Sequence, residues 1–269
     1  MVDFPATAKF LTPEERSYVI WKKKYDNSSV GEEEHFEMRH LWAALSDWKV
    51  WLHALIFMSL LVPLYGITLF LPSIIRSFGY TPAISQLLTV PPYIFATLVV
   101  FAFAHYSDKL KMRSPFIIGG LIMCLFGFAI NISNVAHGVK YFGTFFIVAG
   151  SYSAVPGAVA WHGNNLAGQY KRGIGMALQI GIGNFGGAIA ANIYRSRDAP
   201  RYINGHAFEL MFVGIGLACV PIGVLTYIRI NSKRDALQKA AEEVEEMTKY
   251  SEEDIRRMGD RAPDFRYTL

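Results

Sequence analysis

Six apolar runs follow one another along the chain, and short polar connections separate each run from the next. Each run is close to the roughly 20 residues that a helix, rising about 1.5 Å per residue, needs to cross about 30 Å of hydrocarbon. The pattern therefore predicts an all-α integral membrane protein with six transmembrane helices. We expect these helices at residues 50–71, 87–106, 115–130, 141–161, 173–194 and 208–230.

Charged residues gather before and after these runs. The chain is 52% hydrophobic and only 18% charged, which is too apolar for an ordinary soluble domain. A soluble helical protein with a large core is the alternative, but several runs approach the length of a membrane span. We expect three parts: a cytoplasmic segment at residues 1–49, the six-helix bundle at 50–230 and a cytoplasmic tail at 231–269.

Charge and cysteine usage exclude several classes of partner. The formal net charge of +4 does not indicate a nucleic-acid partner, because the basic residues flank the apolar runs. The lipid bilayer is the predicted partner instead. Both cysteines, Cys124 and Cys219, lie inside apolar runs, so we expect neither a disulfide framework nor a metal site. Walker, G-x-S-x-G and H-E-x-x-H motifs are absent, and we predict no catalytic residues, no enzyme and no cofactor.

Basic residues in the short connections predict the orientation. The connection at residues 108–113 reads DKLKMR, and short basic loops resist translocation, which places this loop in the cytoplasm. The other connections do not decide the matter, because the predicted inner and outer loops each hold five basic residues. Basic residues beside the first and last runs favour two cytoplasmic termini; they are Arg39, Lys49, Arg229, Lys233 and Arg234.

Small residues are concentrated in two of the runs. The tract at 149–158 reads AGSYSAVPGA, and the fifth run holds six glycines between Gly173 and Gly187. Small residues let helices approach closely in lipid. The motif GIGNFGG at 181–187 loosely resembles a dinucleotide fingerprint, but it lies within an apolar helix rather than after a strand. We therefore interpret both tracts as sites of close helix packing.

Several segments carry a family resemblance. The loop DKLKMR resembles the loop between the second and third helices of each six-helix half in the major facilitator superfamily. Other segments are similar to its fungal anion:cation symporters, which include the allantoate, nicotinate and pantothenate permeases. These segments are FPATAKFLTPEER (4–16), SQLLTVPPY (85–93), WHGNN (161–165), RDAPRYINGH (197–206) and GDRAPDFRYTL (259–269). The resemblance implies the C-terminal half of such a transporter, with the central loop and helices seven to twelve.

The implied function is transport of a small organic anion by alternating access, driven by a cation gradient. A carboxylate such as nicotinate, pantothenate or allantoate is the implied small-molecule substrate. The chain is then a half-transporter or a fragment, and its partner is the missing N-terminal six-helix half or a second copy. We expect it in the plasma membrane. A non-transporting membrane scaffold or regulatory protein that keeps the fold is the alternative.

Four polar side chains lie deep in the predicted spans and are candidates for a substrate cavity: Tyr65, Tyr152, Gln179 and Asn184. Cavity lining and interhelical hydrogen bonding fit the amides equally well, whereas a structural role is favoured for the tyrosines. No Asp, Glu, Lys or Arg lies near the middle of a predicted span, so we expect the titrating group in the other half. By resemblance, Asp108 and Arg113 are expected to form a charge-assisted contact at the cytoplasmic gate.

Overall fold

The computed structural model describes residues 8–26, 37–195, 198, 201–243 and 258–269. All regular secondary structure within these ranges is helical. Two helices, α1 (Pro13–Asp26) and α2 (Met38–Leu45), precede the bundle. The remaining elements are α3 (Trp48–Arg76), α4 (Pro82–Leu87), α5 (Val90–Leu110), α6 (Ser114–Ile132), α7 (His137–Asn164), α8 (Gln169–Ile193), α9 (Ile203–Glu243) and the short 3-10 helix η3 (Gly259–Arg261).

Six helices in the described part of the chain are long and apolar enough to cross a membrane, as the sequence predicts. The second of them combines α4 and α5. The first begins at Trp48, because Asp47 caps α3 by accepting a hydrogen bond from the backbone amide of Lys49 at 3.1 Å. The last extends beyond its predicted end at residue 230, because the sequence that follows is rich in good helix formers.

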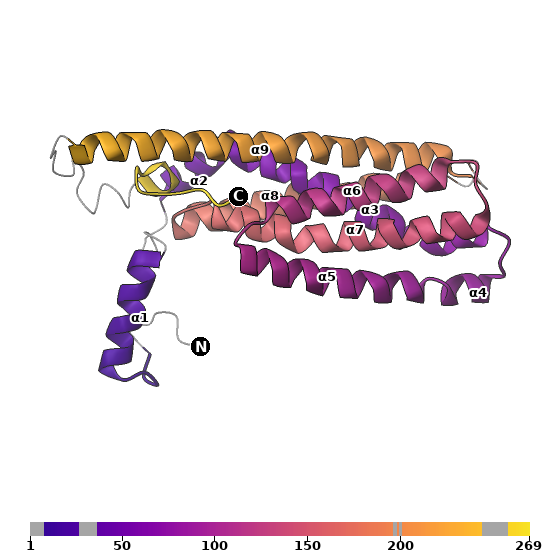
Figure 1. The fold of residues 1–269 in the computed structure, drawn as a ribbon, viewed down its shortest axis with the longest axis horizontal. Helices are drawn as coiled ribbons and strands as arrows, with labels where there is room; N and C mark the ends of the chain where they lie inside the picture. The colour runs from indigo at the N-terminus through magenta and orange to yellow at the C-terminus, as the bar shows by residue number, and fades with distance from the viewer. Residues whose placement is uncertain (1–7, 27–36, 196–197, 199–200, 244–257) are drawn as a thin grey trace.

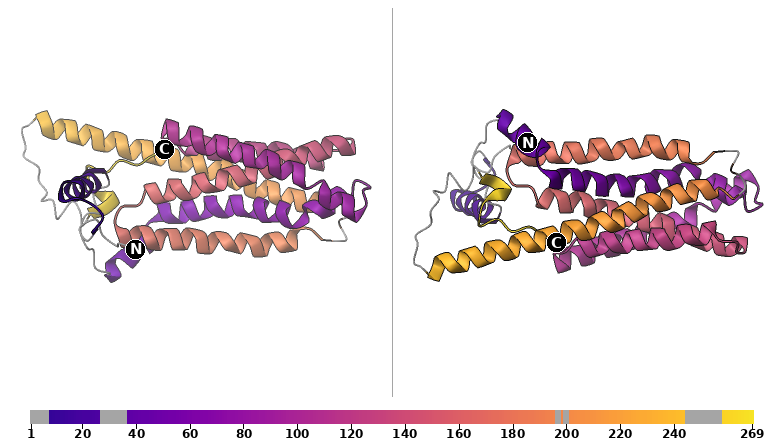
Figure 2. Two further views of the ribbon diagram at one scale, coloured as in Figure 1. Left: turned by 90° about the horizontal axis from the view of Figure 1, so that it is seen from below. Right: turned by 90° about the horizontal axis from the view of Figure 1, so that it is seen from above.

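Helix α3 lies at the centre of the bundle and packs against α7, α8 and α9. Helices α6 and α7 form the most extensive interface, α5 packs on α7, and α9 covers α3 and α6 (Figures 1 and 2). Large side chains such as Ile56, Phe128 and Trp161 are fully buried between these helices. A movement of α3 would therefore disturb three interfaces at once.

The segments next to the two termini lie at the same end of the bundle, which we call the terminal end (Figure 1). The start of α3 and the last residues of the chain meet there, since Lys49 contacts Asp260. The connections between α5 and α6 and between α7 and α8 also lie there, because Arg113 contacts Leu269 and Asn165 contacts Thr268. We call the end with the other connections the opposite end.

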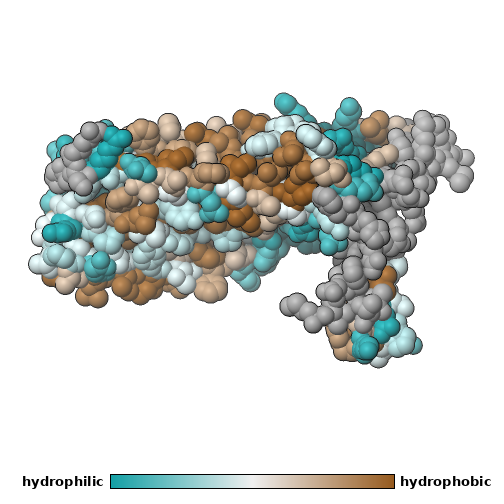
Figure 3. All heavy atoms as spheres, turned by 180° about the vertical axis from the view of Figure 1, so that it is seen from behind, coloured by the Kyte–Doolittle hydropathy of each residue, from teal (hydrophilic) through white to brown (hydrophobic). Residues whose placement is uncertain are grey.

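Large apolar side chains cover much of the outer surface of the bundle (Figure 3). Leu98 and Phe101 of α5 are 65% and 70% exposed, and Phe126 of α6 is 53% exposed. Apolar surface of this extent is unusual for a protein in water. In a bilayer, the same side chains face lipid tails at no such cost.

Facing glycines bring α6 and α7 into close contact. A Cβ atom at Gly150 would lie 2.4 Å from the carbonyl oxygen of Gly120. A Cβ atom at Gly127 would lie 2.6 Å from the carbonyl oxygen of Gly143. The two pairs are about two helical turns apart on each helix and so share one face. The packing role predicted for the tract at 149–158 is confirmed at Gly150.

Glycines of α8 pack against α3 in the same way. A Cβ atom at Gly183 would lie 2.3 Å from the ring of Phe57, and one at Gly186 would lie 3.1 Å from the side chain of Val62. The motif at 181–187 is therefore a packing motif at these two positions. The opposite face of α8 is exposed and carries Asn184.

Candidate functional site

The exposed face of α8 continues across α3 and α7 as a polar surface. The hydroxyl of Tyr65 donates a hydrogen bond to the side-chain oxygen of Asn184 at 3.0 Å, which joins α3 to α8. One turn further along α3, the hydroxyls of Thr68 and Tyr152 lie 2.9 Å apart and join α3 to α7. We call Tyr65, Thr68, Tyr152 and Asn184 the polar face.

The polar face lies at membrane depth. Tyr65 is three residues past the middle of α3, or about 5 Å along its axis. Thr68 and Asn184 are exposed, while Tyr65 and Tyr152 are partly buried. Exposed polar groups at this depth are costly in lipid, so the face suits contact with water or with another protein.

The structure brings together three of the four predicted cavity residues and separates the fourth. Gln179 is fully buried, and its amide donates a hydrogen bond to the carbonyl oxygen of Ala158 in α7 at 3.3 Å. This placement fits interhelical hydrogen bonding, one of the two roles that the sequence allowed for the amides. The spacing of Gln179, Gly183 and Gly186 is a signal for it, because residues four and seven apart share a helix face.

Sequence reasoning missed two members of this region. Thr68 lies one turn from Tyr65 and so falls on the same side of α3. Tyr93 of α5 makes an edge-on ring contact with Tyr152, with ring centroids 5.7 Å apart. The polar region therefore extends from α8 across α3 and α7 to α5.

Sequence reasoning also missed Glu209. This residue lies at the start of the predicted sixth run, where an acidic residue suggests the boundary between membrane and water. The sequence does contain a signal, since Glu209 is the only acidic residue within the six predicted runs. In the structure its side chain is fully buried against Gly66 of α3. Because Glu209 lies at the start of the predicted sixth run, the prediction that no acidic residue lies near the middle of a span is unchanged.

The predicted gating residues lie together at the terminal end. A guanidinium nitrogen of Arg113 lies 2.5 Å from the carboxylate of Asp108, and a second one donates to the hydroxyl of Ser107 at 2.9 Å. The backbone amide of Arg113 donates to the carbonyl oxygen of Leu269 at 2.6 Å. The loop is thereby joined to the end of the chain.

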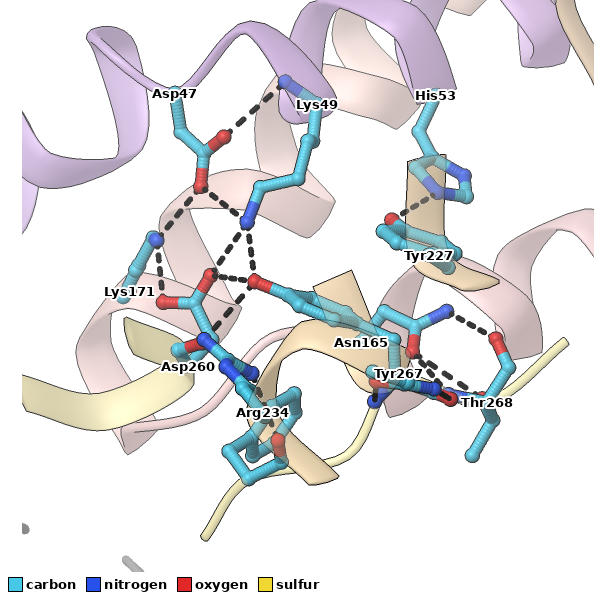
Figure 4. A network of polar contacts seen from close by, with 12 residues as sticks. Asp47, Lys49, His53, Asn165, Lys171, Tyr227, Arg234, Asp260, Tyr267 and Thr268 are labelled. Carbon is cyan, nitrogen blue, oxygen red and sulfur yellow. Dashed lines mark hydrogen bonds and ion pairs between the residues drawn. The ribbon is translucent and has the colours of Figure 1, made fainter. Parts of the chain in front are cut away.

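A buried ion-pair network also lies at the terminal end, where α3, α8 and the last residues meet (Figure 4). The ammonium of Lys171 lies 2.8 Å from the carboxylate of Asp47 and 2.6 Å from that of Asp260. The ammonium of Lys49 lies 3.5 Å and 3.1 Å from the same two carboxylates, and it donates to the hydroxyl of Tyr267. Two cations and two carboxylates, each at most 13% exposed, thus compensate one another.

The last residues of the chain, 259–269, fold over the helix ends, and we call them the C-terminal clasp. The backbone amide of Thr268 donates to the side-chain oxygen of Asn165 at 2.7 Å. Tyr267 exchanges two backbone hydrogen bonds with the side chain of Asn231, at 2.8 and 2.9 Å. The clasp therefore ties the connection after α7 to α9.

The network also changes the acidity of the clasp. Burial raises the pKa of Asp260, but the cations of Lys171 and Lys49 outweigh this effect and hold the pKa below its ordinary value. Burial and the carboxylate of Asp260 both raise the pKa of Tyr267. At neutral pH the clasp therefore carries a charged Asp260 and an uncharged Tyr267.

This arrangement predicts a pH dependence of stability. Because the pKa of Asp260 is lower in the folded state, its contribution to stability is complete above the unfolded value of about 3.9 and is lost as pH falls through the folded value. We expect the melting temperature of wild type in detergent to exceed that of Asp260→Asn near neutral pH. The difference should shrink as pH falls below about 4. A difference that does not depend on pH would contradict this assignment.

In the described ranges, no three His, Cys, Asp or Glu side chains lie together as metal ligands. The polar face and the terminal-end network are two arrangements of polar side chains that could serve a function.

Comparison with known proteins decides the family. The profile of the Major Facilitator Superfamily matches residues 6–191, which is more than half of the chain. The chain belongs to the major facilitator superfamily. This assignment and the six spanning helices confirm the predicted fold, that of an integral membrane half-transporter.

Curated relatives in this superfamily are fungal transporters. The chain is 32% identical over 258 residues to the high-affinity nicotinic acid transporter of Saccharomyces cerevisiae, an alignment that covers 96% of this chain and 47% of that protein. It is 34% identical to the MFS-type transporter cnsO of Penicillium expansum, with 97% and 51% covered. It is 30% identical to the major facilitator-type transporter hxnP of Emericella nidulans, with 99% and 54% covered. The chain spans about half the length of the curated relatives it matches, and these relatives are transporters rather than enzymes.

Proposed function

We propose that this chain carries a small organic anion across the membrane together with a second six-helix bundle. The substrate is a carboxylate such as nicotinate, pantothenate or allantoate. The nicotinic acid transporter among the relatives supports this substrate class. Alternating access, coupling to a cation gradient, a plasma-membrane location and two cytoplasmic termini belong to the same proposal.

The polar face is the observation that carries this proposal. Its hydroxyl and amide groups can donate hydrogen bonds to a carboxylate, and they lie at membrane depth on three neighbouring helices, where Thr68 and Asn184 are exposed and Tyr65 and Tyr152 are partly exposed. A companion bundle on α3, α7 and α8 would turn this face into one wall of a cavity. We propose that the companion is an N-terminal six-helix half or a second copy of the chain.

The terminal end has a separate part in the proposal. Asp108 and Arg113 steady one conformer at the cytoplasmic gate, supported by their ion pair and by the hydrogen bond from Arg113 to the clasp. The terminal-end network holds the clasp in place in that conformer.

Uptake of radiolabelled nicotinate tests the proposal. Cells express the chain alone or together with the half of the yeast nicotinic acid transporter that it does not match. We expect saturable uptake with the companion, and an inward proton gradient should increase it. Membrane-inserted chain that takes up no substrate in either arrangement would favour the non-transporting scaffold.

A matched pair of variants tests the polar face. Asn184→Ala removes the acceptor of Tyr65 and should lower uptake about tenfold, equivalent to about 1.4 kcal/mol. Asn192→Ala changes an exposed asparagine of the same helix whose amide bonds only its own helix, at the carbonyl oxygen of Ala188, and should leave uptake unchanged. Equal losses in the two variants would contradict a specific role for the polar face.

A further inference from the structure

Glu209 of α9 is buried without a partner. Its side chain is 0% exposed, and neither carboxyl oxygen forms a hydrogen bond with a residue that the structure describes. The carboxyl fills the space beside Gly66 of α3, because a Cβ atom at that position would lie 1.8 Å from one of its oxygens. The glycine thus provides a notch in α3 that admits the carboxyl.

The notch lies within the membrane. Gly66 is four residues past the middle of α3, which is about 6 Å along a helix that spans the whole bundle. An ionised carboxylate without a partner is very costly at this depth, whereas a neutral carboxyl is far less so. In the arrangement shown, Glu209 therefore holds a proton.

Two buried groups with exchangeable protons lie near Glu209, toward the start of α9. His206 lies one turn before Glu209 on the same face of α9, and its ring nitrogen lies 3.0 Å from the hydroxyl of Tyr194. His206 and Tyr194 are 2% and 6% exposed. Tyr194 and Cys124 of α6 lie within electrostatic range of Glu209, and Lys140 of α7 lies within range of His206. Among the described residues, these are the titratable groups with an electrostatic interaction with the carboxyl or with the histidine beside it.

Helix α3 connects the notch with the polar face. Tyr65 comes directly before Gly66 and bonds Asn184, while Gly66, about 100° further around the helix, faces Glu209. Pro63, one turn earlier, has no amide hydrogen and leaves the carbonyl of Ser59 without its helical donor, which weakens α3 at this point. A bend of α3 that moves Tyr65 would therefore also open the notch.

We propose that Glu209 is the proton-binding carboxyl that couples substrate movement to a proton gradient in this half of the carrier. The carboxyl binds its proton in the arrangement shown. It releases the proton to water when α3 moves away from α9, leaving a hydrated carboxylate that is protonated again before α3 returns. The inference rests on the proposed cation-coupled transport and names its coupling group.

Glu209→Gln tests the proposal, because glutamine keeps the size of the side chain but cannot release a proton. We expect accumulation of labelled nicotinate against its gradient to fall at least tenfold, while exchange of internal for external nicotinate stays within twofold of wild type. Glu14→Gln, the same change at an exposed acidic residue of α1, should change neither rate. Retained accumulation in Glu209→Gln, or equal loss of accumulation and exchange in correctly folded protein, would overturn the proposal.

Infrared spectroscopy supplies a readout that does not need transport. The carbonyl stretch of a protonated carboxyl should be present at neutral pH in wild-type membranes. It should be absent in Glu209→Gln, and it should remain when any other acidic residue of α9 is replaced. Absence of this band in wild type overturns the proposal. Absence of uptake in wild type would contradict the proposed function but not the protonation of Glu209. In that case the infrared band alone shows whether Glu209 holds a proton.

Discussion

Replacement of Lys171 by methionine is expected to destabilise the bundle by about 3–5 kcal/mol. The substitution keeps most of the side-chain volume but leaves the carboxylates of Asp47 and Asp260 with only Lys49 between them. Lys171 and the two carboxylates that it contacts are at most 7% exposed, so water cannot replace the lost cation. The free energy of unfolding in mixed detergent micelles, measured by titration with dodecyl sulfate, checks this result.

Two comparisons show whether the effect comes from burial of the ion pairs. Arg39→Met removes an ion pair with Glu37 in which both side chains are at least half exposed, and it should cost less than about 1 kcal/mol. The double variant Lys171→Met with Asp260→Asn should lose less stability than the sum of its two single variants, because it removes one charge of each sign. Additive losses would mean that Lys171 and Asp260 do not interact in the folded protein.

Replacement of Gly150 by alanine is expected to destabilise the interface between α6 and α7 by about 1–3 kcal/mol. The added methyl group would lie 2.4 Å from the carbonyl oxygen of Gly120 and 2.9 Å from the backbone nitrogen of Cys124. Backbone atoms cannot rotate aside as a flexible side chain can, so the two helices must separate. The same unfolding measurement should show the loss.

Gly214→Ala is the matched control for this change. Gly214 lies inside α9, and no atom lies within 4 Å of the position that its Cβ would occupy. Alanine favours the helix there by up to about 1 kcal/mol, so this variant should be as stable as wild type or slightly more stable. A Gly150→Ala protein as stable as Gly214→Ala would contradict the close approach of α6 and α7.

The spans were predictable because their signal is local. A helix that crosses hydrocarbon must be apolar over about 20 residues, and such a run can be recognised from consecutive residues alone. The packing roles of Gly150 and Gly183 followed from composition in the same way. The end of α9 was harder to place, because the residues after 230 favour a helix whether or not they lie in the membrane.

The two arrangements that depend on tertiary structure could be predicted only in part. Tyr65 and Asn184 were singled out by depth, but depth alone could not separate Asn184 from the buried Gln179. The pairing of Lys171 with Asp260 joins residues 89 positions apart, and no local pattern encodes it. Glu209 was visible as an isolated acid, but its position against Gly66 depends on how α9 crosses α3.

Accessibility of single cysteines to a membrane-impermeant maleimide, in cells that take up nicotinate, tests the central claim most directly. Both native cysteines are at most 8% exposed and should give little background. With cysteine at Thr68 or Asn184 we predict labelling that excess nicotinate suppresses, because the polar face borders a water-filled path. With cysteine at Leu98 or Phe101 we predict no labelling, because these two side chains of α5 face lipid. Labelling at Leu98 and Phe101 without labelling at Thr68 and Asn184 would contradict the account.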